Sequence, residues 1–278
     1  MVRKKILLGH SPDADDAFMF YGITSGKISS SKFDFEHVIK DIQTLNKMAI
    51  NKELDTTAVS ANAYLKIQND FRIMDCGASM GDNYGPIVVG KKKIDINRNT
   101  KIGIPGKLTS AFLLLRLYCN EADFIELDFD DIIPAIENDD VDAGLIIHEG
   151  QITYKDLGYE ILLDLPKLWS VQCKYPIPLG LNVIKRDFNE IEQNEISQLI
   201  KSSINFALAN IDEALDYSMK FGRGVKLEVA REFVLMYVNN DTVNINTRGI
   251  HGLNFFYSKA KQEGLIDSLP KLDIIKTK

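Results

Sequence analysis

The 278-residue sequence has no long uninterrupted apolar segment. Its stretch AFLLLRLY at 111–118 is interrupted by Arg116, whereas a membrane-spanning helix needs about 20 apolar residues. Near the N-terminus only Ile6, Leu7 and Leu8 follow the basic residues, and a secretion signal needs about 7 to 15 apolar residues. We therefore expect a cytoplasmic protein with no membrane partner.

Paired cysteines and clustered metal ligands are also lacking. Cys76, Cys119 and Cys173 are far apart and in no CxxC spacing, which argues against a disulfide framework or a zinc site and fits a reducing compartment. No histidine pair or carboxylate cluster has the spacing of a metal site. The sequence therefore predicts that no metal is bound.

Positive charge and cofactor motifs are scarce. The formal net charge is −6, and the clearest basic run, GKKKID at 90–95, is expected to be a solvated turn. Nucleic-acid binding needs a basic face, so no such partner is expected. No GxSxG, HExxH or GxGxxG motif occurs where its chemistry needs it, and GIPGK at 103–107 lacks P-loop spacing. We expect no cofactor.

The residues that are present are typical of a folded α/β protein. Apolar residues make up 45% and charged residues 26% of the chain, an ordinary globular mixture. Hydrophobic periodicity alternates between strand-like and helix-like segments. The first series has strands at 4–10, 33–39, 55–60, 71–76 and 85–92 with helices at 15–25, 41–51 and 61–68. The second has strands at 100–106, 123–129, 142–150 and 159–165 with helices at 108–120 and 130–139. Helices are then expected at 195–211, 212–222, 227–240 and 249–264.

This pattern predicts an α/β fold of two lobes joined by two chain crossings. Residues 1–95 and 180–278 would form lobe I, which carries the C-terminal helices, and residues 98–176 would form an inserted lobe II. Parallel strands need right-handed crossover connections, which the intervening helices supply. The default place for a ligand is then the cleft between the lobes.

Polar residues at strand-to-helix turns are the candidate site residues, because ligands of open α/β sheets lie beyond the carboxyl ends of the strands. His148 ends an apolar strand and is followed by Glu149. It is either a general base or a histidine that only caps a turn. Thr109, Ser110 and Ser60 either hold an anionic oxygen or cap their helices.

The opening turn holds three aspartates, Asp13, Asp15 and Asp16. Acidic residues are favoured at helix starts by capping and by the helix dipole. We expect Asp13 or Asp15 to cap the helix and Asp16 to order the site. A magnesium site is the less favoured alternative.

Six segments together resemble, in order, the family that contains 1,4-dihydroxy-6-naphthoate synthase of the futalosine route to menaquinone. They are HSPDADDAFMFYG, HVIKDIQTLNKMA, TTAVSANAY, GDNYGPIVV, IPGKLTSAFLLL and DDVDAGLIIHEGQITY. The resemblance implies a fold like that of type II periplasmic solute-binding proteins, used as a cytoplasmic enzyme. It implies a lyase that converts cyclic dehypoxanthinyl futalosine to 1,4-dihydroxy-6-naphthoate without a metal or redox cofactor.

The resemblance also assigns roles to residues. The proton acceptor of the family falls on His148. The substrate-contacting segments of the family fall on Ala58, Val59, Ser60, Ser110 and Ala111. Thr109 is adjacent to them, and Ser11 and Asp16 are added from the opening turn. These residues are expected to bind a small acidic organic substrate.

One departure leaves the substrate open. Bacterial synthases of this family usually carry Ser-Pro-Cys-Pro-Asn-Asp-Thr-Phe at the opening turn, whereas residues 11–18 here read SPDADDAF. The two added carboxylates would repel an acidic ligand. Alternatives are a chorismate dehydratase-type activity on the same fold and a non-catalytic cytoplasmic protein that binds small anions. The sequence leaves a homodimer open.

Overall fold

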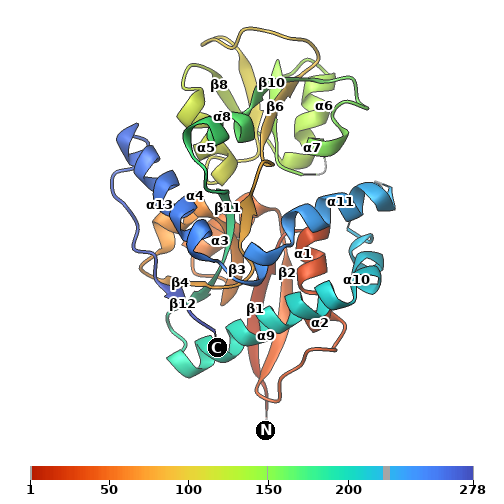
Figure 1. The fold of residues 1–278 in the computed structure, drawn as a ribbon, viewed down its shortest axis with the longest axis vertical. Coiled ribbons are helices and arrows are strands. Elements are labelled where there is room, and N and C mark those ends of the chain that lie inside the picture. The colour runs from red at the N-terminus through yellow and green to blue at the C-terminus, as the bar shows by residue number, and fades with distance from the viewer. Residues whose placement is uncertain (1, 149, 222–225, 278) are drawn as a thin grey trace. The chain divides into compact units, whose positions relative to one another are not determined.

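The computed structural model describes residues 2–148, 150–221 and 226–277, and its ribbon is drawn in Figure 1. The chain divides into two compact units. The first contains Met1–Met80, Gly180–Thr247 and Pro270–Lys278, and the second contains Gly81–Leu179 and Arg248–Leu269.

The first unit is built on a mixed sheet. Its strand order is β12-β4-β11-β3-β1-β2, and β5 also pairs with β11. Strands β1, β2 and β3 are parallel, whereas β11 runs antiparallel to β3 and β4. The strands are β1 (Lys4–His10), β2 (Phe33–Ile39), β3 (Thr56–Ser60), β4 (Phe71–Met74), β5 (Ser79–Gly81), β11 (Ile177–Lys185) and β12 (Ile274–Ile275).

Helices pack on both faces of this sheet. The alternation of strand side chains sends Ile6 and Leu8 into one apolar cluster, which Phe18 of α1 and Ile200 of α9 share. Gly9 follows Leu8 and faces the opposite side of the sheet, toward Leu45 of α3, where an added Cβ would clash. The helices are α1 (Ala14–Met19), α2 (Tyr21–Thr24), α3 (Ile42–Ile50), α4 (Ala61–Ile67), α9 (Glu190–Ala209), α10 (Ile211–Ser218), α11 (Leu227–Tyr237) and α12 (Asn240–Val243).

The second unit has its own sheet and core. Its strand order is β10-β6-β9-β7-β8, and β7 is parallel to both β8 and β9. Ile87 of β6, Ile146 of β9 and Ile132 of α6 share one apolar cluster. The strands are β6 (Ile87–Gly90), β7 (Lys101–Ile104), β8 (Asp123–Glu126), β9 (Ala143–Ile146) and β10 (Glu160–Asp164). The helices are α5 (Ser110–Tyr118), α6 (Ile132–Glu137) after a 3-10 turn (Phe129–Asp131), α7 (Gly150–Thr153), α8 (Leu165–Gln172) and α13 (Thr247–Gln262).

The unit boundaries differ from the predicted lobes in two places. Residues 81–95 and 248–269, which the sequence pattern placed in lobe I, belong to the second unit. The first difference arises because β6 pairs with both β9 and β10. The second arises because Phe255 and Phe256 of α13 pack on the Trp169 ring of α8. The chain therefore passes between the units at four points, two of which flank α13.

Two differences from the predicted elements bear on the candidate residues. The helix predicted at 15–25 is divided into α1 and α2 at Phe20, which has a non-helical backbone conformation (φ −92°, ψ 3°). The strand predicted at 142–150 ends at Ile146, so His148 lies in the following loop.

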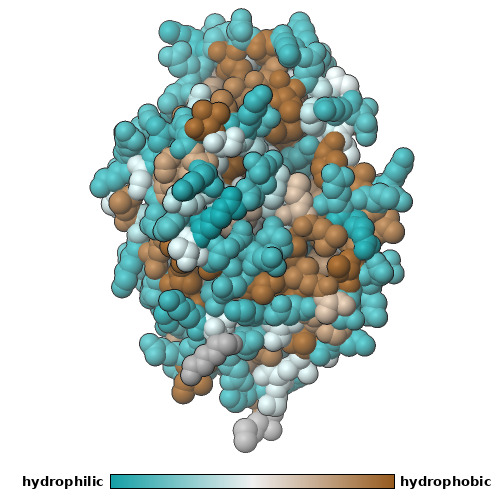
Figure 2. Space-filling model, viewed as in Figure 1, coloured by the Kyte–Doolittle hydropathy of each residue, from teal (hydrophilic) through white to brown (hydrophobic). Residues whose placement is uncertain are grey.

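The surface is mainly polar where it can be seen. Figure 2 shows hydrophilic residues over much of the visible face, with apolar groups among them. Across the described ranges, every helix is too short or too polar to cross a bilayer.

Candidate functional site

Two candidate residues of the first unit lie at neighbouring strand ends. Ser11 directly follows β1, which ends at His10, and Ser60 ends β3. Since β1 and β3 are parallel neighbours, with Gly9 opposite Thr57, their carboxyl ends lie at the same edge of the sheet. Val59 and Ser60 are buried, and Ala58 is half-buried. This edge is where open α/β sheets bind ligands.

Asn46 holds Ser60 at both its backbone and its side chain. The Ser60 N–H donates to Asn46 Oδ1 at 2.9 Å, and Asn46 Nδ2 donates to Ser60 Oγ at 3.0 Å. Asn46 is fully buried. Because Ser60 Oγ accepts the Asn46 bond, its own hydroxyl hydrogen is left to donate to a further acceptor. Asn46 thus orients Ser60 as a hydrogen-bond donor.

The sequence analysis missed Asn46. A signal was present, because Asn46 lies four residues after Ile42 and next to Leu45, on the apolar face of α3. A polar residue on such a face needs a hydrogen-bond partner inside the protein. That partner is 14 residues away, in another element.

The opening turn is closed by Ser11 and two of the three aspartates. The Ser11 N–H donates to Asp16 Oδ2 at 2.6 Å, and the Ser11 hydroxyl donates to Asp13 Oδ2 at 2.9 Å. Asp13 is the N-cap residue of α1, but its side chain makes no capping bond to the helix. The expectation that Asp13 or Asp15 caps the helix is therefore wrong, because the Asp13 carboxylate accepts the Ser11 hydroxyl instead and Asp15 lies inside the first turn of α1. Asp16 orders the turn through the Ser11 backbone.

Burial, helped by the nearby Asp13, raises the pKa of Asp16 to about 7 in spite of the hydrogen bonds from Ser11, which lower it. Between pH 4 and 7 the Asp16 carboxyl is therefore protonated in the folded state. In the unfolded state its pKa is near 3.8, so it is ionised over the same range. The contribution of Asp16 to stability is present below pH 4 and is lost as pH rises from 4 to 7.

We expect Asp16→Asn to raise the free energy of unfolding of the first unit at pH 8 and to leave it nearly unchanged at pH 4. The amide keeps an oxygen for the Ser11 N–H and removes the buried charge. The gain should grow by about 1.4 kcal/mol per pH unit between pH 4 and pH 7 and then stay constant up to pH 8. Urea unfolding across this pH range measures it, with Asp34→Asn on the exposed edge of β2 as the control. A constant difference at all pH values would contradict the assignment.

A pair of histidines lies next to the opening turn. His10 Nδ1 is 2.9 Å from the Ser11 carbonyl oxygen, and His10 Nε2 is 3.0 Å from His37 Nδ1. The carbonyl only accepts, so His10 carries its hydrogen on Nδ1 and His37 donates to His10 Nε2. Burial, with the neighbouring His37, lowers the pKa of His10 to about 4, and burial also lowers the pKa of His37. The two uncharged rings fix the Ser11 peptide from its carbonyl side.

Thr109 and Ser110 begin α5 in the second unit. Thr109 is its N-cap: its hydroxyl accepts from the Phe112 N–H at 3.1 Å and donates to the Gly106 carbonyl at 2.8 Å. The capping alternative therefore holds for Thr109. The Ser110 hydroxyl donates to the Leu179 carbonyl, so its hydrogen is committed inside the unit. Ala111 is buried in the first turn of α5.

His148 follows the carboxyl end of β9 and is buried, with 8% of its surface exposed. The Gly150 N–H donates to His148 Nδ1 at 3.0 Å. A neutral ring with Nδ1 as acceptor carries its hydrogen on Nε2. The ring centroid is 5.8 Å from that of Phe129. Glu149, the neighbouring candidate, lies outside the described residues.

The second-unit candidates share one edge of their sheet. The helix that starts at Ser110 follows β7, and His148 follows β9. Strands β7 and β9 are parallel neighbours, with Ile102 opposite Ala143. Each unit therefore has a group of candidates at strand carboxyl ends. Within the ranges that the structure covers, no cluster of three or more His, Cys, Asp or Glu side chains could hold a metal ion.

Comparison with known proteins places these groups in a family. A profile of the family described as menaquinone biosynthesis matches residues 6–262. The chain is 31% identical to 1,4-dihydroxy-6-naphthoate synthase of Thermus thermophilus, over 95% of this chain and 97% of that protein.

Solved structures share the fold. A crystal structure of a protein from Archaeoglobus fulgidus has a TM-score of 0.91 and 47% identity, and the match covers 94% of this chain and 98% of that one. A Candida albicans protein with the generic periplasmic binding protein fold has a TM-score of 0.71 at 12% identity, with 99% and 97% coverage. The predicted periplasmic-binding-protein-like α/β fold is confirmed.

Proposed function

We propose that this chain, which belongs to the menaquinone biosynthesis family, is a lyase that converts cyclic dehypoxanthinyl futalosine to 1,4-dihydroxy-6-naphthoate. The observation that supports a catalytic role most directly is the buried His148 at the carboxyl end of β9, beside the strand that leads into Thr109 and Ser110. A buried imidazole at a strand end is suited to proton transfer.

The proposed chemistry divides between proton transfer and oxygen binding. Cleavage of a carbon–carbon bond beside a carbonyl needs a group that takes a proton and donors for the developing oxyanion. We assign proton transfer to His148. Ser60 is suited to donate to a substrate oxygen, because Asn46 leaves its hydroxyl hydrogen available. Ala58 and Val59 in the first unit, and Ala111 in the second, stay candidates for substrate contact.

The hydrogen bond from the Gly150 N–H limits how His148 could accept a proton. In the described conformation the neutral ring presents Nε2–H as a donor, and Nδ1 accepts from Gly150. To accept a proton, Nδ1 must give up that bond when the substrate binds. Catalytic hydrogen bonds often rearrange on substrate binding, and α7 begins at Gly150 directly after this loop.

We further propose that the protein acts in the cytoplasm. Its three cysteines, Cys76, Cys119 and Cys173, are all free thiols. Free thiols, two of them buried, are typical of a reducing compartment.

Incubation of the purified protein with cyclic dehypoxanthinyl futalosine tests the proposed reaction. We expect formation of 1,4-dihydroxy-6-naphthoate, followed by mass spectrometry. Dehydration of chorismate without naphthoate formation would instead support the chorismate dehydratase-type alternative. Saturable binding without any product would support the anion-binding alternative.

A further inference from the structure

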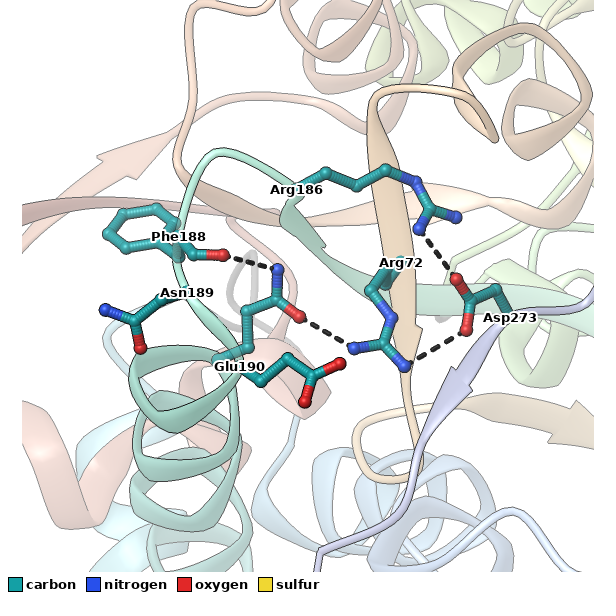
Figure 3. Close-up of a pocket in the computed structure, with 7 residues that line it drawn as sticks. Arg72, Arg186, Phe188, Asn189, Glu190 and Asp273 are labelled. Atoms are coloured by element: carbon teal, nitrogen blue, oxygen red, sulfur yellow. Dashed lines mark hydrogen bonds and ion pairs between the residues drawn. The ribbon is translucent and has the colours of Figure 1, made fainter.

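A cavity of about 630 Å³ lies in the first unit (Figure 3). It is lined by two arginines and an aspartate that are bonded to one another, Arg72, Arg186 and Asp273. The other lining residues are Phe188, Asn189, Glu190 and Gln193.

This cavity lies at the end of the sheet opposite Ser60. Arg72 is near the start of β4, and Ser60 is at the end of β3. Both strands run antiparallel to β11 and therefore run in the same direction. The cavity is thus separate from the group of Ser11, Asp16 and Ser60.

The two guanidinium groups are held in place by shared partners. Arg72 Nη2 donates to Asp273 Oδ1 at 3.1 Å, and Arg186 Nη1 donates to Asp273 Oδ2 at 2.6 Å. Arg72 Nη1 also donates to Gln193 Oε1, and Arg186 donates twice to the Gln68 carbonyl. The dashed lines in Figure 3 show the bonds among the cavity residues. The arginines are therefore positioned without any ligand.

One carboxylate serves both arginines. Burial raises the pKa of Asp273, but the hydrogen bonds from Arg186 and Arg72 outweigh this and hold it below its ordinary value. Asp273 therefore stays ionised and neutralises only one of the two guanidinium charges. The Arg72 and Arg186 side chains are 20% and 32% exposed, so both remain accessible from solvent.

The guanidinium groups also have hydrogens to spare. Each guanidinium has five N–H donors. Among the described residues, the bonds above use two donors of Arg72 and three of Arg186. Guanidinium donors match the oxygens of carboxylate and phosphate groups geometrically.

Glu190 is the competing charge. It is the first residue of α9, a helix of 20 residues whose start favours negative charge. Figure 3 shows its side chain extending toward the Arg72 guanidinium. Glu190 is exposed and lines the cavity, so its carboxylate would repel an entering anion.

We propose that this cavity is a binding site for a small oxyanion, a phosphate or carboxylate group, which the spare donors of Arg72 and Arg186 bind. The site is independent of the proposed lyase activity. The bound anion would thus contact the two arginines that hold Asp273, the residue directly before β12.

Calorimetric titration of the full chain with inorganic phosphate, and separately with citrate, tests this site at constant ionic strength. We expect saturable binding of at least one anion, and the preferred one identifies the ligand group. Arg186→Gln should weaken that binding at least tenfold, since it removes a guanidinium that makes charge-assisted hydrogen bonds to the anion. Glu190→Gln should tighten it severalfold, because the competing charge is gone.

Three further variants separate the alternatives. Arg231→Gln, which alters an exposed ion pair with Asp212, should leave binding unchanged, and so should Ser60→Ala. Arg186→Lys keeps the positive charge but lacks the planar guanidinium group, so it should weaken binding severalfold. This variant tests the site if Arg186→Gln does not fold. Absence of saturable binding at millimolar anion would overturn the proposal. So would equal losses in Arg186→Gln and Arg231→Gln, or a loss in Ser60→Ala alone.

Discussion

Replacement of His148 by Asn or Ala should lower kcat for naphthoate formation by about 100- to 10,000-fold, the range that a proton-transfer group supplies. Substrate binding, measured by calorimetry, should change little, because His148 acts mainly on the reacting proton. The side chain is 8% exposed, so each variant also needs a circular dichroism spectrum and an unfolding midpoint. Loss of binding together with loss of folding would show that His148 is structural.

His148→Gln distinguishes two chemical roles for the same ring. The Gln amide places an N–H near the position of imidazole Nε2 but takes up no proton. If His148 accepts the proton through Nδ1, Gln and Asn should be equally inactive. If the ring acts as an Nε2–H donor, as its bond from Gly150 presents it, Gln should retain substantially more activity than Asn.

His251→Asn is the matched control for these variants. His251 is exposed on α13 of the same unit, and its ring lies against Tyr175 at 4.9 Å between centroids. It has no assigned role in the site. A loss in His251→Asn as large as that in His148→Asn would remove the case for a specific role of His148.

Asn46→Ala should lower kcat/KM by about 10- to 100-fold, because small misplacements of positioning groups have effects of this size. The variant removes both bonds that orient Ser60. It also leaves the buried Ser60 N–H without its acceptor, which costs about 1 to 3 kcal/mol in the free energy of unfolding. Kinetics and urea unfolding of the same preparation measure the two effects.

A double-mutant cycle separates positioning from general damage. If Asn46 acts through Ser60, Asn46→Ala should have little further effect on kcat/KM in a Ser60→Ala background. Asn51→Ala, at the exposed end of α3, controls for an Asn-to-Ala change on this helix. Additive effects of the two substitutions would show that Asn46 does not act through Ser60.

Local features of this fold could be predicted from short stretches of sequence. Asp41 caps α3 by accepting from the Thr44 N–H, and Thr109 caps α5. Both depend only on residues three positions apart, which a sequence pattern contains. The same holds for the alternation of strands and helices. The roles of His148, Ser60 and Ser110 in substrate binding stay predictions that rest on family membership.

Contacts between distant elements could not be predicted in this way. The His10–His37 pair, the Asn46 bonds to Ser60 and the Asp273 bridge each join residues from separate elements. Local preference does not specify such partners. They are set by strand register and by which helix covers which face of the sheet.

The sequence by itself determined the α/β class, the element order and the family, because these follow from periodicity and from motifs within short segments. Only the tertiary structure decided that β6 and α13 belong to the second unit, that Asp13 binds Ser11 instead of capping α1, and which ring nitrogen of His148 accepts a hydrogen bond. The physical reason is that a hydrogen bond or a packed ring depends on distances of a few ångströms. Those distances are set only when the strands have paired and the helices have packed on the sheets.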